Sequence, residues 1–545
     1  MSWRKLISSH PVAAALVVTG ICLLPVVASR DFTPANELRY LSIVDEAMEE
    51  GSLFAFYNQG QPYTDKPPLY FWLMMLCKAL AGHHSIFLLS LLSIMPAFAT
   101  IGVFDRWVYG GRKDVNPVER GAVALLLGTC GMFLGATIVL RMDMLMTLFI
   151  VLALRSFFVM YEKPSRRKVE SWLLPLWIFL ALFSKGPVGL LMPPLVIAVF
   201  LAVKKDWKGI WKYAGGKTLA VIAVLAGAWF LCVYLDGGKE YLGDLVFHQT
   251  FDRAVHAFHH KEPFWWYAWV IWMDVAPYCV LLVPAIVASW LGKPSAGTVR
   301  SDKEIFFGIA IAATFLMLSC FSSKLPVYLL PIVPFCVYMF PLLAQRIGWK
   351  PWMYVLLTVS TSAIALAALA FLTGLAFLKD IPAVARLTGE YPFVLSPFIR
   401  VGVVLLFAFS AAAVAYSWKR EGWLSWISLS VGILLFVCSS GFGMKDINPY
   451  IGYGSLCKEI PRDVRVVTLY VQRPENMDAY LGRDIAKDYG RDPEAFLAAE
   501  PAGTGPAMLV VKTSRLDAAP RLREFIGKQS RAVSSVGPYT LVLYE

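Results

Sequence analysis

Long apolar runs, almost free of charge, alternate with short polar connections along most of the chain. Each run is about 17–25 residues long, the length that a helix needs to cross the hydrocarbon core of a bilayer. The pattern predicts an all-α polytopic membrane protein up to residue 442. Thirteen spans are expected, at about residues 11–29, 85–104, 121–140, 143–160, 171–184, 187–203, 218–235, 266–290, 304–321, 325–344, 352–377, 398–417 and 423–441.

The charges between the runs predict the orientation. Lys and Arg gather in alternate loops, such as 105–120, 161–168 and 204–212, and such loops stay on the cytoplasmic side. The N-terminus is basic too, so an even number of spans must separate it from residues 105–120. The apolar stretch 68–82, which contains Lys78, is therefore predicted to lie on the outer surface instead of crossing.

Composition agrees with a membrane protein. Hydrophobic residues make up 58% of the chain and charged residues 16%, against about 45–50% and about 25% in soluble domains. The net charge of +12 would suggest nucleic acid as a partner if it lay on one soluble face. Because it lies in the short loops instead, no nucleic-acid partner is expected.

The pattern changes after residue 443. Stretches with strand character alternate with amphipathic helical stretches. The strands are VRVVTLYVQ, AMLVVKTS and YTLVLYE, and the helices are DPEAFLAAE and APRLREFIGKQ. Residues 443–545 are expected to form a small α/β domain outside the membrane, which serves packing or acceptor docking, and residues 1–442 form the transmembrane domain.

The polar loop at 30–84, with its juxtamembrane helices, carries the first candidates. Thr33, Pro34 and Gly51 are residue types suited to the cap, the first position and the end of a helix. A helix between them would present polar groups to a substrate head group; the equal alternative is a solvated surface helix.

On that predicted helix Asn36, Arg39, Tyr40 and Ile43 share one face, and Glu37 lies one step round it. Tyr40 is placed in the candidate substrate groove.

Lys66 stands between Asp65 and two prolines, where the chain returns to the membrane surface. A cation fixed at that depth is a natural phosphate ligand. The alternative is an interfacial lysine whose ammonium group reaches toward water.

Further ionisable residues interrupt the apolar runs on the predicted outer side. Arg141 and Asp143 lie between two spans, and Lys185 and Lys324 lie in tight turns. Each alone could anchor a helix end, but ionisable groups at membrane depth usually mark a site. Together they favour a basic pocket with acidic residues beside it, in which Lys324 is a further phosphate ligand and Arg141 lines the groove.

Four of the seven His residues lie between 248 and 260. Histidine is the commonest metal ligand, but no close metal-binding spacing is present. A metal site would need a distant partner such as Asp65, and an interfacial loop is favoured by the pattern alone.

Six short motifs follow one another along the chain. They are NELRY at 36–40, DKPP at 65–68, LRMDML at 140–145, SKGP at 184–187, HKEPFW at 260–265 and SKLPVYLLP at 323–331. With these six motifs in this order, the chain resembles the bacterial membrane glycosyltransferases related to protein O-mannosyltransferases, and in particular the lipid A aminoarabinose transferases. The resemblance covers about residues 10–345.

The resemblance implies a GT-C fold and transfer of a sugar from a polyprenyl-phosphate donor on the periplasmic side, with inversion at the anomeric carbon. By matched position, Lys66 binds the donor phosphate with help from Arg39 and Lys185. Asp143 then helps to organise the acceptor or the polar site.

The same comparison implies that Tyr63 and Tyr328 line the donor groove. It also places Asp65 and His260 where a divalent metal (Zn, Mg or Mn) can bind in the aminoarabinose transferases. No other cofactor is expected.

One departure concerns the acid that the family usually has in its first loop, because Asn36 stands there. An amide cannot act as a general base. Either Glu37 or Asp31 takes that role, or activation depends mainly on positioning. A phosphate acceptor would need little base, which tilts the prediction away from protein hydroxyl acceptors; a divergent or inactive member is the other consequence.

The sequence thus predicts a glycosyltransferase of the bacterial inner membrane, acting as a monomer among membrane lipids on lipid A or another envelope glycan. The N-terminus is expected in the cytoplasm and the C-terminal domain in the periplasm. The competing class is a polyprenyl-lipid transporter or flippase. Such proteins often show internal repeats and broken helices near the midplane, and no repeat of two halves is visible in the sequence.

Overall fold

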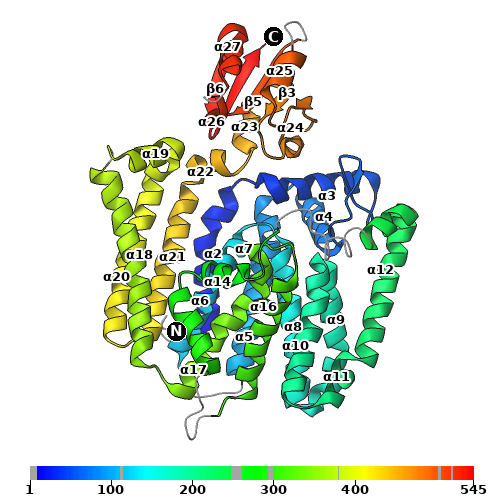
Figure 1. Ribbon diagram of the computed structural model, residues 1–545, viewed down its shortest axis with the longest axis vertical. Helices are drawn as coiled ribbons and strands as arrows, with labels where there is room; N and C mark the ends of the chain where they lie inside the picture. The colour runs from blue at the N-terminus through cyan, green and yellow to red at the C-terminus, as the bar shows by residue number, and fades with distance from the viewer. Residues whose placement is uncertain are drawn as a thin grey trace.

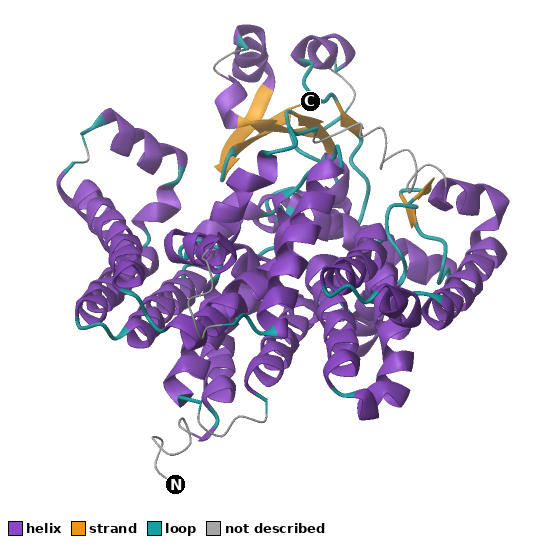
Figure 2. Ribbon diagram, turned by 60° about the horizontal axis from the view of Figure 1, so that its bottom comes forward, coloured by secondary structure: helices purple, strands orange, loops and turns teal. Residues whose placement is uncertain are grey.

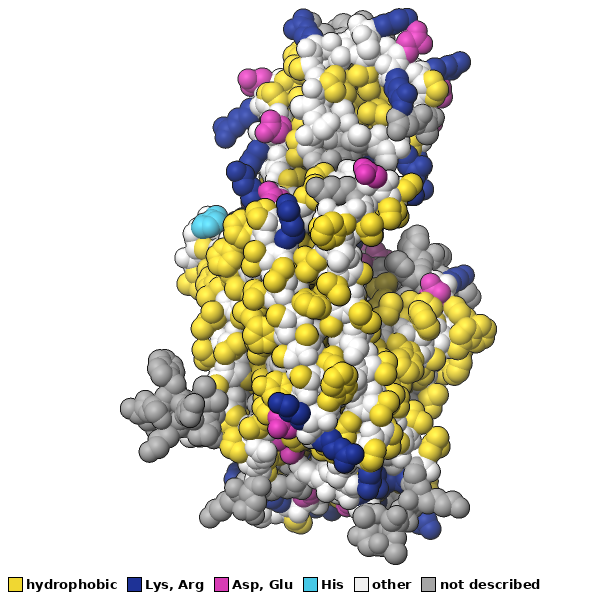
Figure 3. Space-filling model, turned by 90° about the vertical axis from the view of Figure 1, so that its left-hand side faces the viewer, with side chains coloured by type: hydrophobic (Ala, Val, Ile, Leu, Met, Phe, Trp, Pro, Cys, Tyr) yellow, Lys and Arg dark blue, Asp and Glu magenta, His cyan; other side chains and the backbone are white. Residues whose placement is uncertain are grey.

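The computed structural model describes residues 9–110, 115–246, 261–291, 299–378, 380–500, 505–516 and 519–544. A bundle of helices carries a small sheet domain at one end, the end at which α3 (Arg39–Glu50), α4 (Leu69–Ala81) and α19 (Pro382–Glu390) also lie (Figure 1). Figure 3 shows a broad band of hydrophobic side chains on one face of the bundle, with Lys and Arg side chains above and below it. This distribution suits a protein embedded in a bilayer.

Within these ranges, nine helical segments are long and apolar enough to cross a membrane. They contain α2 (Pro11–Ser29), α5 (Ile86–Tyr109), α8 (Met142–Glu162), α12 (Gly216–Gly243), α16 (Asp302–Cys320), α17 (Val333–Ile347, after the 3-10 helix η4, Pro326–Ile332), α18 (Pro351–Phe377), α20 (Pro397–Trp418) and α21 (Gly422–Phe442). Nine of the predicted spans are thereby found.

The other four predicted spans are broken or fall outside that set. Residues 121–140 form α6 (Pro117–Thr129) and α7 (Gly131–Ile138), bent by 67°, and residues 266–290 form α14 (Trp266–Asp274) and α15 (Cys279–Leu291). The remaining two are α9 (Arg167–Lys185) and α10 (Pro187–Val203).

The two breaks lie against each other. The Gly131 N–H donates to the carbonyl of Ala276 at 2.7 Å, and a Cβ at Gly131 would stand 3.3 Å from that oxygen. The close approach of the two backbones thus explains why glycine stands at position 131. The N–H group of one break is hydrogen-bonded to the carbonyl group of the other.

The stretch predicted to lie on the outer surface forms the separate 13-residue helix α4. It lies beside α3 at the end of the bundle that faces the sheet domain (Figure 1). Tyr70, Phe71 and Met74 are its buried residues, and they belong to the apolar cluster that also holds the core of α3. This helix therefore packs as part of the opening loop.

The C-terminal domain is built on a five-stranded sheet in the order β4-β3-β5-β7-β6, drawn in orange in Figure 2. Its strands are β3 (Arg465–Leu469), β4 (Lys487–Asp488), β5 (Ala507–Lys512), β6 (Ser530–Val536) and β7 (Tyr539–Tyr544), with helices α25 (Pro493–Ala499) and α27 (Pro520–Gln529). The three predicted strands and both predicted helices are present. The strand β6 was not predicted, because its exposed, serine-rich edge lacks an apolar face.

One face of this sheet packs under α25 and α27. Val466, Met508 and Leu541, from β3, β5 and β7, instead join the apolar cluster of the opening loop, which includes Leu38 and Ile43. The loop is therefore enclosed between the bundle and the C-terminal domain.

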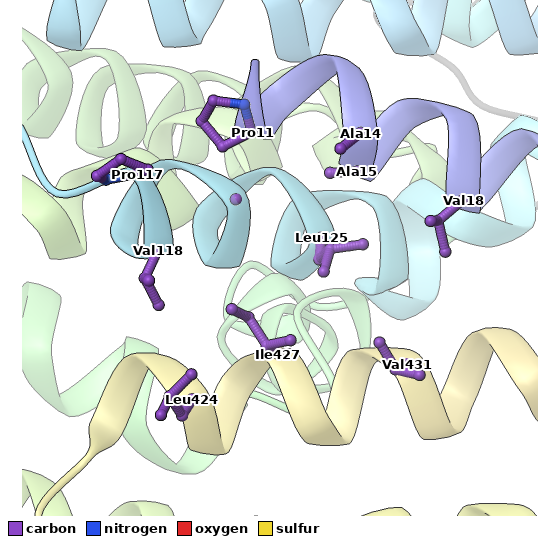
Figure 4. Close-up of a pocket in the computed structure, with 11 residues that line it drawn as sticks. Pro11, Ala14, Ala15, Val18, Pro117, Val118, Leu125, Leu424, Ile427 and Val431 are labelled. Carbon is purple, nitrogen blue, oxygen red and sulfur yellow. The ribbon is translucent and has the colours of Figure 1, made fainter. Parts of the chain in front are cut away.

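A cavity of about 400 Å³ lies between α2, α6 and α21 (Figure 4). Its lining is aliphatic, with Ala14, Leu125 and Ile427 among the side chains. Pro11 and Pro117, the first residues of α2 and α6, mark its position at the helix ends away from the opening loop. No charged group lines it, so it is unsuited to a phosphate or a sugar.

Candidate functional site

The helix predicted in the opening loop is present, with a different start. Residues Pro34–Leu38 form one turn of π-helix, η1, which leads into α3. Gly51 ends α3 in the left-handed conformation, with φ of 74°, which glycine adopts without strain. The Thr33 hydroxyl makes no capping bond; its backbone N–H is bound by Glu37 instead, at 2.7 Å.

Glu37 is fully buried and accepts four hydrogen bonds. Two come from the Arg30 guanidinium, at 2.7 and 2.9 Å, one from the Thr33 N–H, and one from the Leu140 N–H at 2.6 Å. A carboxylate that is fully occupied by protein donors is poorly placed to take a proton from a substrate. The geometry corrects the assignment of Glu37 as a base: it ties the opening loop to the segment before α8.

Asp31, the other acid considered as a base, is similarly engaged. It is 9% exposed, and it accepts from the N–H groups of Phe32 and Gly454 at 2.8 and 2.6 Å and from the Tyr480 hydroxyl. Its carboxylate faces the C-terminal domain, and this contact replaces the predicted catalytic role.

Asp143 forms the centre of a cluster of cations. Its carboxylate is buried, forms an ion pair with Lys185 and lies 3.4 Å from the Arg141 guanidinium. Lys66 also interacts with it electrostatically. The Lys185 ammonium lies 4.6 Å from the centroid of the Tyr328 ring. The structure thus brings together five of the predicted residues from four separate segments.

Arg39 points from the start of α3 and is held in place on two sides. Its guanidinium donates to the Asn36 side-chain oxygen at 3.0 Å and lies 5.4 Å from the ring centroid of Tyr63 and 6.0 Å from that of Tyr40. An amide oxygen orients the guanidinium without neutralising it, so Arg39 keeps its charge for a ligand. The Asn36 side chain therefore has a use that a carboxylate could not fill in the same way.

Tyr40 and Asp65 lie in the same group. Burial raises the pKa of Tyr40 to about 12, and the nearby Arg39, Asp143 and Asp65 charges act on it as well. The hydroxyl consequently stays protonated near neutral pH and can donate a hydrogen bond.

Lys324 lies at the edge of the site and is buried. Its ammonium donates to the carbonyls of Glu262 and Phe321 at 2.9 and 2.5 Å, next to an isolated β-bridge between Lys261 and Ser323. Two of the three ammonium protons are used in hydrogen bonds that join residues 262 and 321, so the predicted role of Lys324 as a phosphate ligand competes with a structural role.

The comparisons with known proteins agree on the architecture. Residues 65–230 match the family described as dolichyl-phosphate-mannose-protein mannosyltransferase. The crystal structure of ArnT from Cupriavidus metallidurans bound to undecaprenyl phosphate superposes with a TM-score of 0.71 at 19% identity, covering 99% of this chain and 98% of that one. The protein has the GT-C fold. The resemblance drawn from the sequence is thereby confirmed.

Two further proteins share parts of this likeness. The undecaprenyl phosphate-α-4-amino-4-deoxy-L-arabinose arabinosyl transferase of Pseudomonas aeruginosa is 24% identical over 365 residues, which are 66% of this chain and 64% of that enzyme. The alignment thus spans a little under two thirds of the relative's length. The archaeal oligosaccharyltransferase AglB from Archaeoglobus fulgidus superposes with a TM-score of 0.51 at 12% identity, covering 99% of this chain and 74% of that one.

The metal site stays a prediction. His260 lies outside the described residues, and within the described ranges no three His, Cys, Asp or Glu side chains are grouped to hold a metal ion. Asp65 alone supplies too few ligands for zinc, which takes three or four from the protein.

Three residues that hold the GT-C site together were not singled out in the sequence. Arg30 pairs with a buried acid, and Asp236, at the outer end of α12, accepts from the three N–H groups of residues 53–55. The Tyr241 hydroxyl donates to the carbonyl of Tyr63 at 2.9 Å. For Arg30 and Asp236 the only sequence signal is a charge at the end of an apolar run, and Tyr241 has none. The partners of Asp236 and Tyr241 lie far along the chain.

Proposed function

We propose that this protein is an integral membrane glycosyltransferase that moves a sugar from a polyprenyl-phosphate donor to an acceptor on the outer side of the bacterial inner membrane. One observation carries the proposal: four cations and two carboxylates gather in one cluster at the helix ends beside the opening loop. The cations are Arg39, Lys66, Arg141 and Lys185, and the carboxylates are Asp65 and Asp143. The excess of two positive charges suits a phosphate.

The expected reaction breaks the bond between the anomeric carbon and the lipid phosphate. The acceptor oxygen attacks from the opposite face, so the configuration inverts, and the bonding electrons leave with the phosphate. Lys66 and Lys185 stabilise the charge that grows on this leaving group, which is the largest source of catalysis available here. Asp143 keeps Lys185 and Arg141 in place without cancelling the positive field of the whole cluster.

The acceptor is proposed to be lipid A or another envelope glycan. Asn36 cannot remove a proton, and Glu37 and Asp31 are occupied by protein donors. An acceptor that is already an anion, such as a phosphate, needs little base. The name of the Pseudomonas relative specifies an undecaprenyl-phosphate-linked aminoarabinose donor, and a donor of that class is proposed for this chain. The enzyme acts as a monomer, with its N-terminus in the cytoplasm and its C-terminal domain in the periplasm.

Mass spectrometry of lipid A and envelope glycans tests the proposal. Cells that express the protein should carry a sugar that is missing from cells without the gene and from cells that express Lys66→Ala at the same level. Identical envelopes in all three strains would refute it.

The paired breaks of α6–α7 and α14–α15 support a second candidate, since discontinuous helices near the midplane are a feature of transporters. Proteoliposomes separate the two functions. A transporter would move a labelled polyprenyl phosphate between leaflets without forming any glycosylated product.

A further inference from the structure

The C-terminal domain holds the chain where it leaves the first membrane helix. The Asp31 carboxylate, two residues beyond α2, is bound by the Gly454 N–H at 2.6 Å and by the Tyr480 hydroxyl. Burial, with the Asp31 carboxylate beside it, raises the pKa of Tyr480, so this hydroxyl remains a donor. Hydrogen bonds to an ionised acceptor are about twice as strong as neutral ones.

Two glycines shape this contact, which we call the Asp31 socket (Asp31, Gly452, Gly454 and Tyr480). A Cβ on Gly452 would lie 2.4 Å from Asp31 Oδ2, and one on Gly454 would lie 2.7 Å from it. Both distances are shorter than real Cβ contacts, so a larger residue at either position would force the Asp31 carboxylate to shift. Backbone and carboxylate are therefore fitted to each other closely.

A second set of contacts lies on residues 474–481 of the same domain. Asn476, which is 1% exposed, donates to the carbonyl of Pro34 at 2.7 Å. The Ser42 hydroxyl donates to Asp478 at 3.0 Å. The domain thus holds η1 and α3 directly, on both sides of Arg39.

The socket connects to the cluster of cations around Asp143 through a short chain of contacts. Arg30, the neighbour of Asp31, donates to both oxygens of Glu37. Glu37 in turn accepts from the Leu140 N–H at 2.6 Å. Leu140 immediately precedes Arg141, which contacts Asp143. The contacts of Arg30 and Leu140 with Glu37 are buried hydrogen bonds, and such contacts have few alternative geometries. The steps from Asp31 to Arg30 and from Leu140 to Arg141 are single peptide bonds, and the Arg141–Asp143 pair is partly exposed on the arginine side.

We propose that Asp31 and Tyr480 are positioning residues for sugar transfer, through which the C-terminal domain fixes the opening loop and the segment before α8 against the donor phosphate. This inference rests on the proposed function. Neither residue touches the reacting atoms; each acts through Arg30 and Glu37.

The variant Tyr480→Phe tests the socket, with Tyr489→Phe as a matched control. The Tyr489 hydroxyl donates to Glu500 at 3.0 Å within the same domain, and within the described residues it makes no hydrogen bond to the opening loop. In Tyr480→Phe we expect kcat to fall about tenfold while the Kd for undecaprenyl phosphate changes less than twofold, because the lysines that meet the phosphate remain. The control should match the wild type in both.

Hydrogen–deuterium exchange supplies a readout that is independent of activity. The amides of residues 138–143 should exchange at least fivefold faster in Tyr480→Phe than in the wild type or Tyr489→Phe. Unchanged exchange there, or an unchanged kcat, overturns the positioning role. If the wild type transfers no sugar at all, the proposed function fails, and the exchange result still decides whether the socket orders this segment. Asp31→Asn, which keeps the shape of the side chain, should reproduce both changes.

Discussion

The buried ion pair between Arg30 and Glu37 offers the sharpest test of how the opening loop works. The side chains are 4% and 0% exposed, so neither charge is screened by water. Removing one partner of such a pair costs about 3–5 kcal/mol, since the other is left charged and buried. We expect Glu37→Gln and Arg30→Met each to lower the free energy of unfolding by about that amount.

The double variant should be far less damaging than the two single ones together. It buries no unpaired charge, and the glutamine oxygen still accepts from Leu140; one backbone N–H loses its acceptor, at a cost of about 1–3 kcal/mol. The coupling energy between the sites should therefore be at least about 3 kcal/mol. Unfolding in mixed micelles of increasing SDS fraction measures all four proteins. Additivity of the single effects to within about 0.5 kcal/mol would refute the reasoning.

The same double variant decides the role of Glu37 in catalysis. A general base contributes about 10²–10⁴-fold to a rate. If Glu37 only positions the loop, the stably folded double variant should retain sugar transfer to within about tenfold of the wild type. A loss of a hundredfold or more in that protein would identify Glu37 as the base after all.

Three further predictions concern single side chains. Lys66→Ala should abolish transfer and weaken undecaprenyl phosphate binding, measured by titration in detergent; an unchanged rate in a normally inserted protein would remove Lys66 from the phosphate site. Asn36→Asp puts a carboxylate next to the Arg39 guanidinium and should weaken donor binding, because it neutralises that charge. A higher transfer rate at saturating donor would instead show that position 36 can supply a general base. The third prediction concerns Asp45. Burial raises the pKa of this carboxyl group, but hydrogen bonds from His84 and Lys78 outweigh burial and lower the pKa below its usual value. Its contribution to stability is therefore present at neutral pH and lost as the pH falls through that lowered pKa; thermal unfolding of Asp45→Asn should lack this acid dependence, and parallel pH curves would contradict it.

The sequence predicted the spans well because membrane insertion depends on local apolar length. It missed the breaks at residues 130 and 275–278, since each lies inside a long, mainly apolar run and the two breaks are joined by a hydrogen bond between residues far apart in the sequence. The helix α4 was predicted as a separate surface element from the parity of the basic loops, the short length of its apolar stretch and Lys78 within it.

For the site, the cations were predictable because Lys185 interrupts apolar sequence at membrane depth and Lys66 stands where the polar loop returns to the membrane surface. The roles of Glu37 and Asp31 were not predictable, because the sequence does not show whether a carboxylate binds a substrate or accepts a hydrogen bond from a backbone N–H. Their partners, Leu140 and Gly454, lie far along the chain, and nothing local records those contacts.

The close fit of Gly452 and Gly454 around Asp31 has a consequence for evolution and for engineering. The parts that must match lie 423 positions apart in the case of Gly454, so the C-terminal domain is not an interchangeable module. A chimera that takes this domain from a relative should assemble only if it also takes the residues that follow the first helix. Across relatives, the acid and the two glycines should be inherited or lost together.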